Sequence, residues 1–123
     1  MNSDRARLDA RKERYLRDPL PVRLGNLASN LARIKSIATQ PELGEAAKRV
    51  IRESKHFVEW AGKDAELQVQ IELVELQRQL ARWQFKWNEI WNDLEKRTSV
   101  AAQAGDWSQK ILESSGLLKS PDA

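Results

Sequence analysis

Large apolar residues recur at alternating spacings of four and three along residues 69–94 of this chain. The positions are Val69, Leu73, Leu76, Leu80, Trp83, Trp87, Ile90 and Leu94. These spacings place the side chains on one face of an α-helix and are typical of a heptad seam. With Asp64 as an N-cap, the pattern predicts one long helix that runs from residue 64 to about residue 104.

A second apolar stripe lies on nearly the opposite side of this predicted helix. Its members are Leu67, Ile71, Val74, Ala81 and Phe85. Since a helix that is apolar on two sides is normally covered on both, we expect the first half of the long helix to be buried between neighbouring helices. Beyond Asn88 the second stripe becomes polar, so the second half needs a single partner.

Two shorter amphipathic helices are predicted before the long one, over residues 19–38 and 40–61. The segment from Thr39 to Glu42 matches a capping box, which starts the second helix almost where the first one ends. Gly62 is placed to end the second helix in a left-handed conformation. The short connection favours an antiparallel helical hairpin, with a bent continuous rod as the alternative.

The predicted fold class is therefore all-α, a small helical bundle. The hairpin packs on the long helix, Gly105 and Asp106 end that helix, and a short C-terminal helix follows and stops at Gly116. We predict an N-terminal basic arm at residues 1–18 that is partly flexible and frayed near Met1. A single helical-bundle domain follows at residues 19–118, with a flexible tail at residues 119–123.

Helix lengths raise a problem for this arrangement. At 1.5 Å per residue, a helix over residues 65–104 spans ~60 Å, whereas each hairpin helix spans ~30 Å. The hairpin cannot cover the whole long helix. Either Thr98 and Ser99 mark a break, or the distal half meets the terminal arms or a second copy of the chain.

Composition excludes several kinds of chemistry. The chain has no cysteine, which rules out disulfides, thiolate metal sites and thiol nucleophiles, and its one histidine, His56, rules out multi-histidine metal sites. Gly-rich phosphate loops, G-x-S-x-G and zinc-ligand spacings are absent, so we predict no cofactor and no metal. No segment approaches the ~20 apolar residues of a membrane span, and a cytoplasmic location is expected.

The tryptophan-rich segment is the predicted partner interface. Its residues are Trp83, Trp87, Ile90, Trp91 and Leu94. Because the seam extends beyond its cover within the chain, we predict a non-enzymatic protein–protein interaction or adaptor module that forms a homodimer, or binds another helical protein, through this segment. A packed aromatic core, within the protomer or across a dimer, is the competing interpretation. A stacking surface for bases and a pocket wall for a planar ligand are two others.

Nucleic-acid binding is the alternative function. Residues 1–60 carry 13 Lys or Arg against 8 Asp or Glu, while residues 61–123 carry 8 against 10. The second predicted helix has a basic stripe of Lys48, Arg49, Arg52 and Lys55, which with Arg5, Arg7, Arg11 and Arg14 of the arm could contact phosphates. The competing interpretation is a solvated face balanced by neighbouring glutamates. No helix-turn-helix or RNA-binding signature is present.

Arg49 and His56 are separated by six residues. This spacing resembles the R-x(4–6)-H signature of HEPN-type ribonucleases, small helical bundles in which Arg and His from paired protomers act on RNA. The resemblance covers these two residues, and Val50 stands where that signature often has a polar residue. It implies a ribonuclease as a third hypothesis, with His56 as the acid–base group.

Overall fold

The computed structural model describes residues 2–118 of the 123-residue chain, and its regular elements there are helices. The elements are α1 (Asn2–Arg17), α2 (Leu20–Ile37), a 3₁₀ turn η1 (Pro41–Leu43), α3 (Gly44–Gly62), α4 (Leu67–Phe85), α5 (Trp87–Trp91) and α6 (Leu94–Ser115). The predicted all-α bundle is confirmed. Met1 and the predicted flexible tail at residues 119–123 lie outside the described residues.

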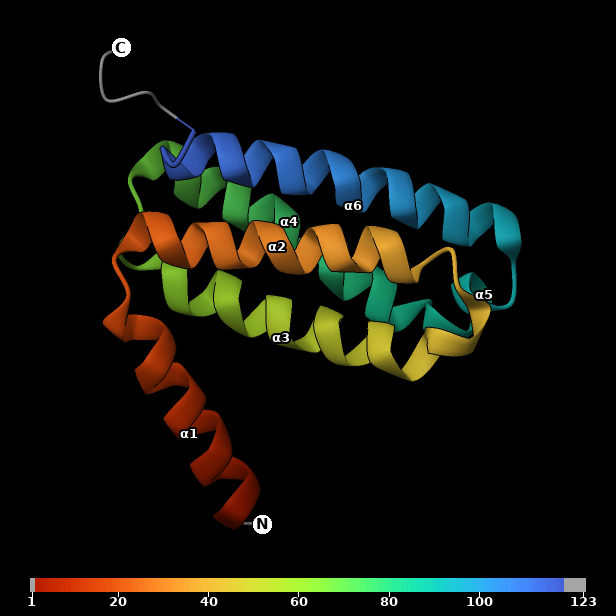
Figure 1. Cartoon of the computed structure of the whole chain (residues 1–123), viewed down its shortest axis with the longest axis horizontal. Helices are drawn as coiled ribbons and strands as arrows, with labels where there is room; N and C mark the ends of the chain where they lie inside the picture. Colours follow the sequence, from red (N-terminus) through yellow and green to blue (C-terminus); the bar gives the residue numbers. More distant parts are fainter. Residues whose placement is uncertain (1, 119–123) are drawn as a thin grey trace.

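Four of the helices, α2, α3, α4 and α6, form an up-down-up-down bundle. Each runs antiparallel to the one before it, and α6 lies along α2 at the top of the view in Figure 1. The predicted antiparallel hairpin over residues 19–38 and 40–61 is present as α2 and α3. Short connections between antiparallel neighbours are the usual solution for such a bundle.

The single long helix was a wrong prediction. The chain turns at Asn92 and Asp93, so that α6 returns along α2 instead of continuing the direction of α4. Asp93 is the N-cap of α6, and its carboxylate accepts hydrogen bonds from the backbone N–H groups of Glu95 (2.9 Å) and Lys96 (3.3 Å). These bonds satisfy two of the amides that the first turn of a helix leaves unpaired.

The predicted helix end at Gly105 is also wrong, and the alternative of a break at Thr98 and Ser99 does not occur. Thr98, Ser99 and Gly105 all lie inside α6, which replaces the expected short C-terminal helix with one of 22 residues. The expected end of that helix is confirmed, because Gly116 has a left-handed φ of 82°. Gly62 has no positive φ and is simply the last residue of α3.

Two predicted helix caps do not form. The hydroxyl of Thr39 donates to the carbonyl of Ser36 at 2.9 Å instead of capping α3. Asp64 lies ahead of α4 and accepts a 2.9 Å hydrogen bond from Nη1 of Arg23 on α2. That ion pair neutralises a buried guanidinium, which would otherwise be costly.

The core is continuous through the bundle and contains most of the predicted seam. Its fully buried large residues are Leu27, Leu31, Ile34, Ile51, Leu76, Leu80 and Ile111. They come from all four bundle helices. Each of the four helices therefore contributes to one core, and the hairpin helices are about as long as α4.

The predicted N-terminal arm is helical from Asn2 onward. Figure 1 shows α1 splayed away from the bundle, with its C-terminal end joined to α2. Tyr15 anchors it, because this residue is buried and its ring stacks on Phe57 at a centroid distance of 4.2 Å. The remaining side chains of α1 are largely exposed.

An aromatic corner closes the end of the bundle where α5 lies. The indole N–H of Trp91 donates to the carbonyl of Pro41 at 2.7 Å, and its ring stacks on Trp87 at 4.9 Å. The buried guanidinium of Arg97 lies 5.5 Å from the Trp91 ring centroid. This corner joins the α2–α3 connection to the chain reversal before α6.

Gly44 tests how tightly this corner is packed. A Cβ atom at Gly44 would lie 2.7 Å from Nε1 of Trp91, so Gly44→Ala must displace the indole and is expected to lower the free energy of unfolding by ~1–3 kcal/mol. Urea denaturation followed by circular dichroism measures the change. In the matched Gly62→Ala variant the added methyl group meets nothing within 4 Å, and stability should stay equal or rise by up to ~1 kcal/mol. Equal stabilities for the two variants would contradict this account of the corner.

Candidate functional site

An exposed apolar stripe follows the outer face of α4. Its large residues are Leu67, Ile71, Val74 and Phe85, with exposed fractions between 48% and 89%, and Ala81 is exposed as well. The sequence predicted that this stripe would be buried between helices, which is wrong. The heptad seam on the opposite face packs on the core, and no described helix covers the outer face.

The cause is the position of α6. This helix packs along α2 and only lightly against α4, because the reversal at Asp93 directs it over the hairpin. Arg78 lies on the same line between Val74 and Ala81. The side chains of Arg78, Ala81, Arg82 and Phe85 surround an open, mainly apolar hollow of about 360 Å³.

Charge along α4 is segregated by sign. Glu72 and Glu75 lie in its first half, whereas Arg78 and Arg82 lie in its second half and Lys86 follows its last residue. None of these five side chains forms an ion pair within 4.0 Å among residues 2–118. The stripe is thus flanked by an acidic end and a basic end.

The predicted tryptophan-rich interface is mostly inside the protomer. Trp83, Trp87 and Ile90 are buried, with exposed fractions of 3%, 7% and 7%. Trp91 is half-buried in the corner described above, and Leu94 is 67% exposed at the start of α6. The first three residues therefore offer little surface to a partner, and the interpretation as a packed aromatic core describes them better.

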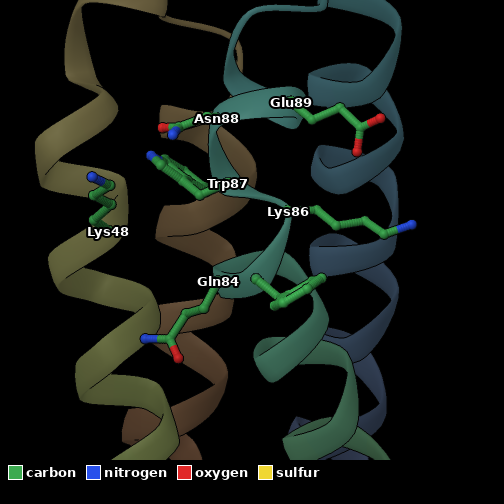
Figure 2. Close-up of a pocket in the computed structure, with 7 residues that line it drawn as sticks. Lys48, Gln84, Lys86, Trp87, Asn88 and Glu89 are labelled. Atoms are coloured by element: carbon green, nitrogen blue, oxygen red, sulfur yellow. The ribbon is translucent and has the colours of Figure 1, made fainter.

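The predicted basic stripe on α3 divides between two places. Lys48 and Lys55 face α4: the ammonium of Lys55 donates to Oε1 of Gln84 at 2.8 Å, and Lys48 pairs with Glu45 at 3.6 Å. Lys48 lines an open hollow of about 460 Å³ at the α4–α5 junction. Figure 2 shows Lys48 and Gln84 beside Trp87 there.

Arg49, Arg52 and His56 lie together in a cleft between α1 and α3. The residues that line the cleft are Asp4, Arg7, Leu8, Arg11, Arg33, Ala46, Arg49, Val50, Arg52, Glu53 and His56, and its volume is about 660 Å³. Arg7 and Arg11 come from the arm, as the nucleic-acid hypothesis expected. Arg33 of α2 was not predicted to join them, because sequence periodicity gives no distance between separate helices.

Contacts at the middle and the C-terminal end of α1 hold this helix beside α3. The Arg11 guanidinium lies 3.3 Å from a carboxylate oxygen of Glu53, and the Tyr15 hydroxyl donates to the carbonyl of Arg23 at 2.8 Å. Burial raises the pKa of the Tyr15 phenol well above its ordinary value. His56 stacks on Trp60 at 5.3 Å, which holds its ring against α3.

Other kinds of site find no support among residues 2–118. No group of three or more His, Cys, Asp or Glu residues is placed to hold a metal ion there. Within the same range no helix combines the length and the apolar character that crossing a membrane requires. Comparison of the chain with protein-family models, curated proteins and solved structures returned no match.

Tyr15→Phe tests the attachment of α1. Loss of the buried hydrogen bond is expected to cost ~1 kcal/mol at pH 7. Because the folded state favours the neutral phenol, its contribution is complete below the unfolded pKa of ~10 and is lost as the pH rises above that value. The range from about pH 9 to about pH 11 brackets the unfolded pKa. Over this range the urea midpoint of the unmodified protein should therefore fall more than the midpoint of the variant. Parallel pH dependences of the two midpoints would contradict the burial of this phenol.

Proposed function

We propose that this protein is a non-enzymatic, self-associating helical module that forms a homodimer through the outer face of α4. The observation that carries the proposal is the exposed apolar stripe of Leu67, Ile71, Val74, Ala81 and Phe85, which Arg78 interrupts between Val74 and Ala81. At 1.5 Å per residue the stripe is ~27 Å long. A contiguous apolar surface of this kind on a small protein commonly marks an interaction site. We also propose a cytoplasmic location, since a cysteine-free chain suits a reducing compartment.

The hydrophobic effect supplies the driving force for association. Removing one large aliphatic or aromatic side chain from water contributes ~1.5–3 kcal/mol, and each protomer offers four such side chains. Part of this gain offsets the loss of translational and rotational freedom on association. Apart from the gap at Arg78, the stripe residues recur every three or four positions, a spacing that suits another helix as the partner surface.

Shape favours a second copy in antiparallel orientation. The stripe positions are symmetric about the level of Leu76, so a two-fold axis there places Leu67 opposite the partner's Phe85. The same axis places Ile71 opposite the partner's Ala81, which pairs a large residue with a small one, and places Val74 against the aliphatic stem of the partner's Arg78. Closed two-fold dimers of this kind, in which one patch meets itself, are the commonest oligomers.

Charge favours the same orientation. Antiparallel pairing brings Glu75 beside the half of α4 that carries Arg78 and Arg82 in the partner, while the Glu72 carboxylate accepts a hydrogen bond from the Ser114 hydroxyl of α6 at 2.6 Å. Parallel pairing would place like charges side by side, which costs free energy. The segregated charges of α4 therefore select both the partner and its direction.

Light scattering on the protein as it elutes from a sizing column tests self-association. We expect a dimer for the unmodified protein at ~100 µM, a concentration well above the micromolar Kd of a modest interface. Ile71→Lys places an ammonium beside Arg78 and Arg82 of the partner in the proposed interface, where like charges repel, and is expected to give a monomer with unchanged helicity. The matched control is Gln68→Lys, which adds the same charge to an exposed position of α4 off the stripe and should remain a dimer. A monomeric unmodified protein, or a dimeric Ile71→Lys variant, would overturn the proposal.

Charge reversal tests the orientation separately. Glu75→Arg and Arg78→Glu each place like charges across the antiparallel interface and are expected to weaken dimerisation about tenfold, or ~1.4 kcal/mol. The double variant restores opposite charges and should recover most of the lost affinity. Sedimentation equilibrium at low salt gives the dissociation constants. Single variants that dimerise as tightly as the unmodified protein would contradict antiparallel pairing.

A further inference from the structure

The cleft between α1 and α3 has walls from three helices. Arg7 and Arg11 lie on α1, Arg33 on α2, and Arg49 and Arg52 on α3. Figure 1 shows α1 diverging from α3 toward its N-terminal end. An extended ligand can therefore lie between the two helices.

The arginines of this cleft greatly outnumber the carboxylates. Five arginines face Asp4 and Glu53. Glu53 is already engaged, since one of its oxygens lies 3.3 Å from the Arg11 guanidinium and the other accepts from Nδ2 of Asn30 at 3.0 Å. Among residues 2–118, the other four arginines of the cleft have no carboxylate within 4.0 Å of a side-chain nitrogen.

The identity of the basic residues indicates the ligand. All five are arginines, and no lysine lines the cleft. Guanidinium groups bind phosphate oxygens through two parallel hydrogen bonds, which an ammonium cannot do. Neighbouring unpaired guanidinium groups repel one another, and a bound polyanion relieves that repulsion.

The spacing of the arginines requires more than one phosphate. Arg7 and Arg11 are one helical turn apart on α1, and the row from Arg49 to His56 on α3 extends over ~10 Å. Exposed Arg14 continues the row on α1 beyond the cleft. Basic rows that continue past an open cleft match a charged groove that follows a strand by its backbone.

We propose that the α1–α3 cleft binds the phosphate backbone of a single-stranded nucleic acid. The site differs from the basic surface expected from the sequence, because it includes Arg33 and excludes Lys48 and Lys55. It shares no residue with the apolar stripe of α4. Binding there is independent of the proposed dimerisation.

Fluorescence anisotropy with a labelled oligouridylate of ~12 nucleotides tests the site. If the cleft contacts three phosphates, log affinity plotted against log salt concentration should have a slope of about −2, since each contact contributes ~0.7. Arg49→Glu and Arg33→Glu alter exposed side chains and are each expected to weaken binding tenfold or more, with helicity unchanged. The matched pair on α1 is Arg7→Glu, inside the cleft, and Lys12→Glu, outside it. Lys12→Glu should change affinity less than about threefold, because Lys12 is exposed outside the cleft and its charge is screened by solvent.

Three results would overturn the proposal. The first is no binding at ~50 mM salt, where phosphate contacts are strong. The second is equal loss of affinity in Lys12→Glu and Arg7→Glu, which would indicate attraction by net charge alone. The third is binding of inorganic tripolyphosphate that depends on Arg49 while the oligouridylate fails to compete, which would assign the cleft to a small phosphorylated molecule.

Discussion

The arrangement of this protein depends on the reversal of the chain at Asp93. The carboxylate of Asp93 caps α6 through two backbone amides, and the helix that it starts packs along α2. Together with α2 and α3, α6 encloses the core that buries most of the heptad seam within one protomer. Because α6 lies along α2, it leaves the outer face of α4 exposed, so the reversal affects both what is buried and what is left exposed.

The helices themselves could be read from apolar periodicity, but the reversal could not. The short α5 keeps the phase of the seam, so Trp87 and Ile90 continue the spacing of α4 across the end of that helix and remain buried. Asp93 is a good N-cap residue, but within a long amphipathic pattern an Asp is equally compatible with an ordinary surface position in the middle of a helix. The predicted long helix would span ~60 Å and each hairpin helix ~30 Å, and this difference in length was the available signal that the chain turns. The turn occurs at Asp93, six residues before Ser99, which belongs to the pair considered as a possible break.

The candidate surfaces show the same limit of sequence reasoning. Periodicity identified the stripe of Leu67, Ile71 and Phe85 as apolar, but what covers a face depends on where α6 packs. Similarly, the basic rows on α1 and α3 were visible in the sequence, whereas their convergence with Arg33 depends on the angle at which Tyr15 fixes α1. The apolar stripe of α4 and the α1–α3 cleft share no residue. Each surface can therefore be altered without changing the other.

Disulfide trapping tests antiparallel self-association most directly, because the chain has no cysteine of its own. Leu67 and Phe85 lie ~27 Å apart along α4, so a cysteine at either position meets its own copy only in a parallel pair. The account predicts that Leu67→Cys and Phe85→Cys chains, mixed and oxidised, form a mixed disulfide dimer, while each chain alone stays uncrosslinked. Efficient crosslinking of either chain with itself, or no mixed product, would contradict it.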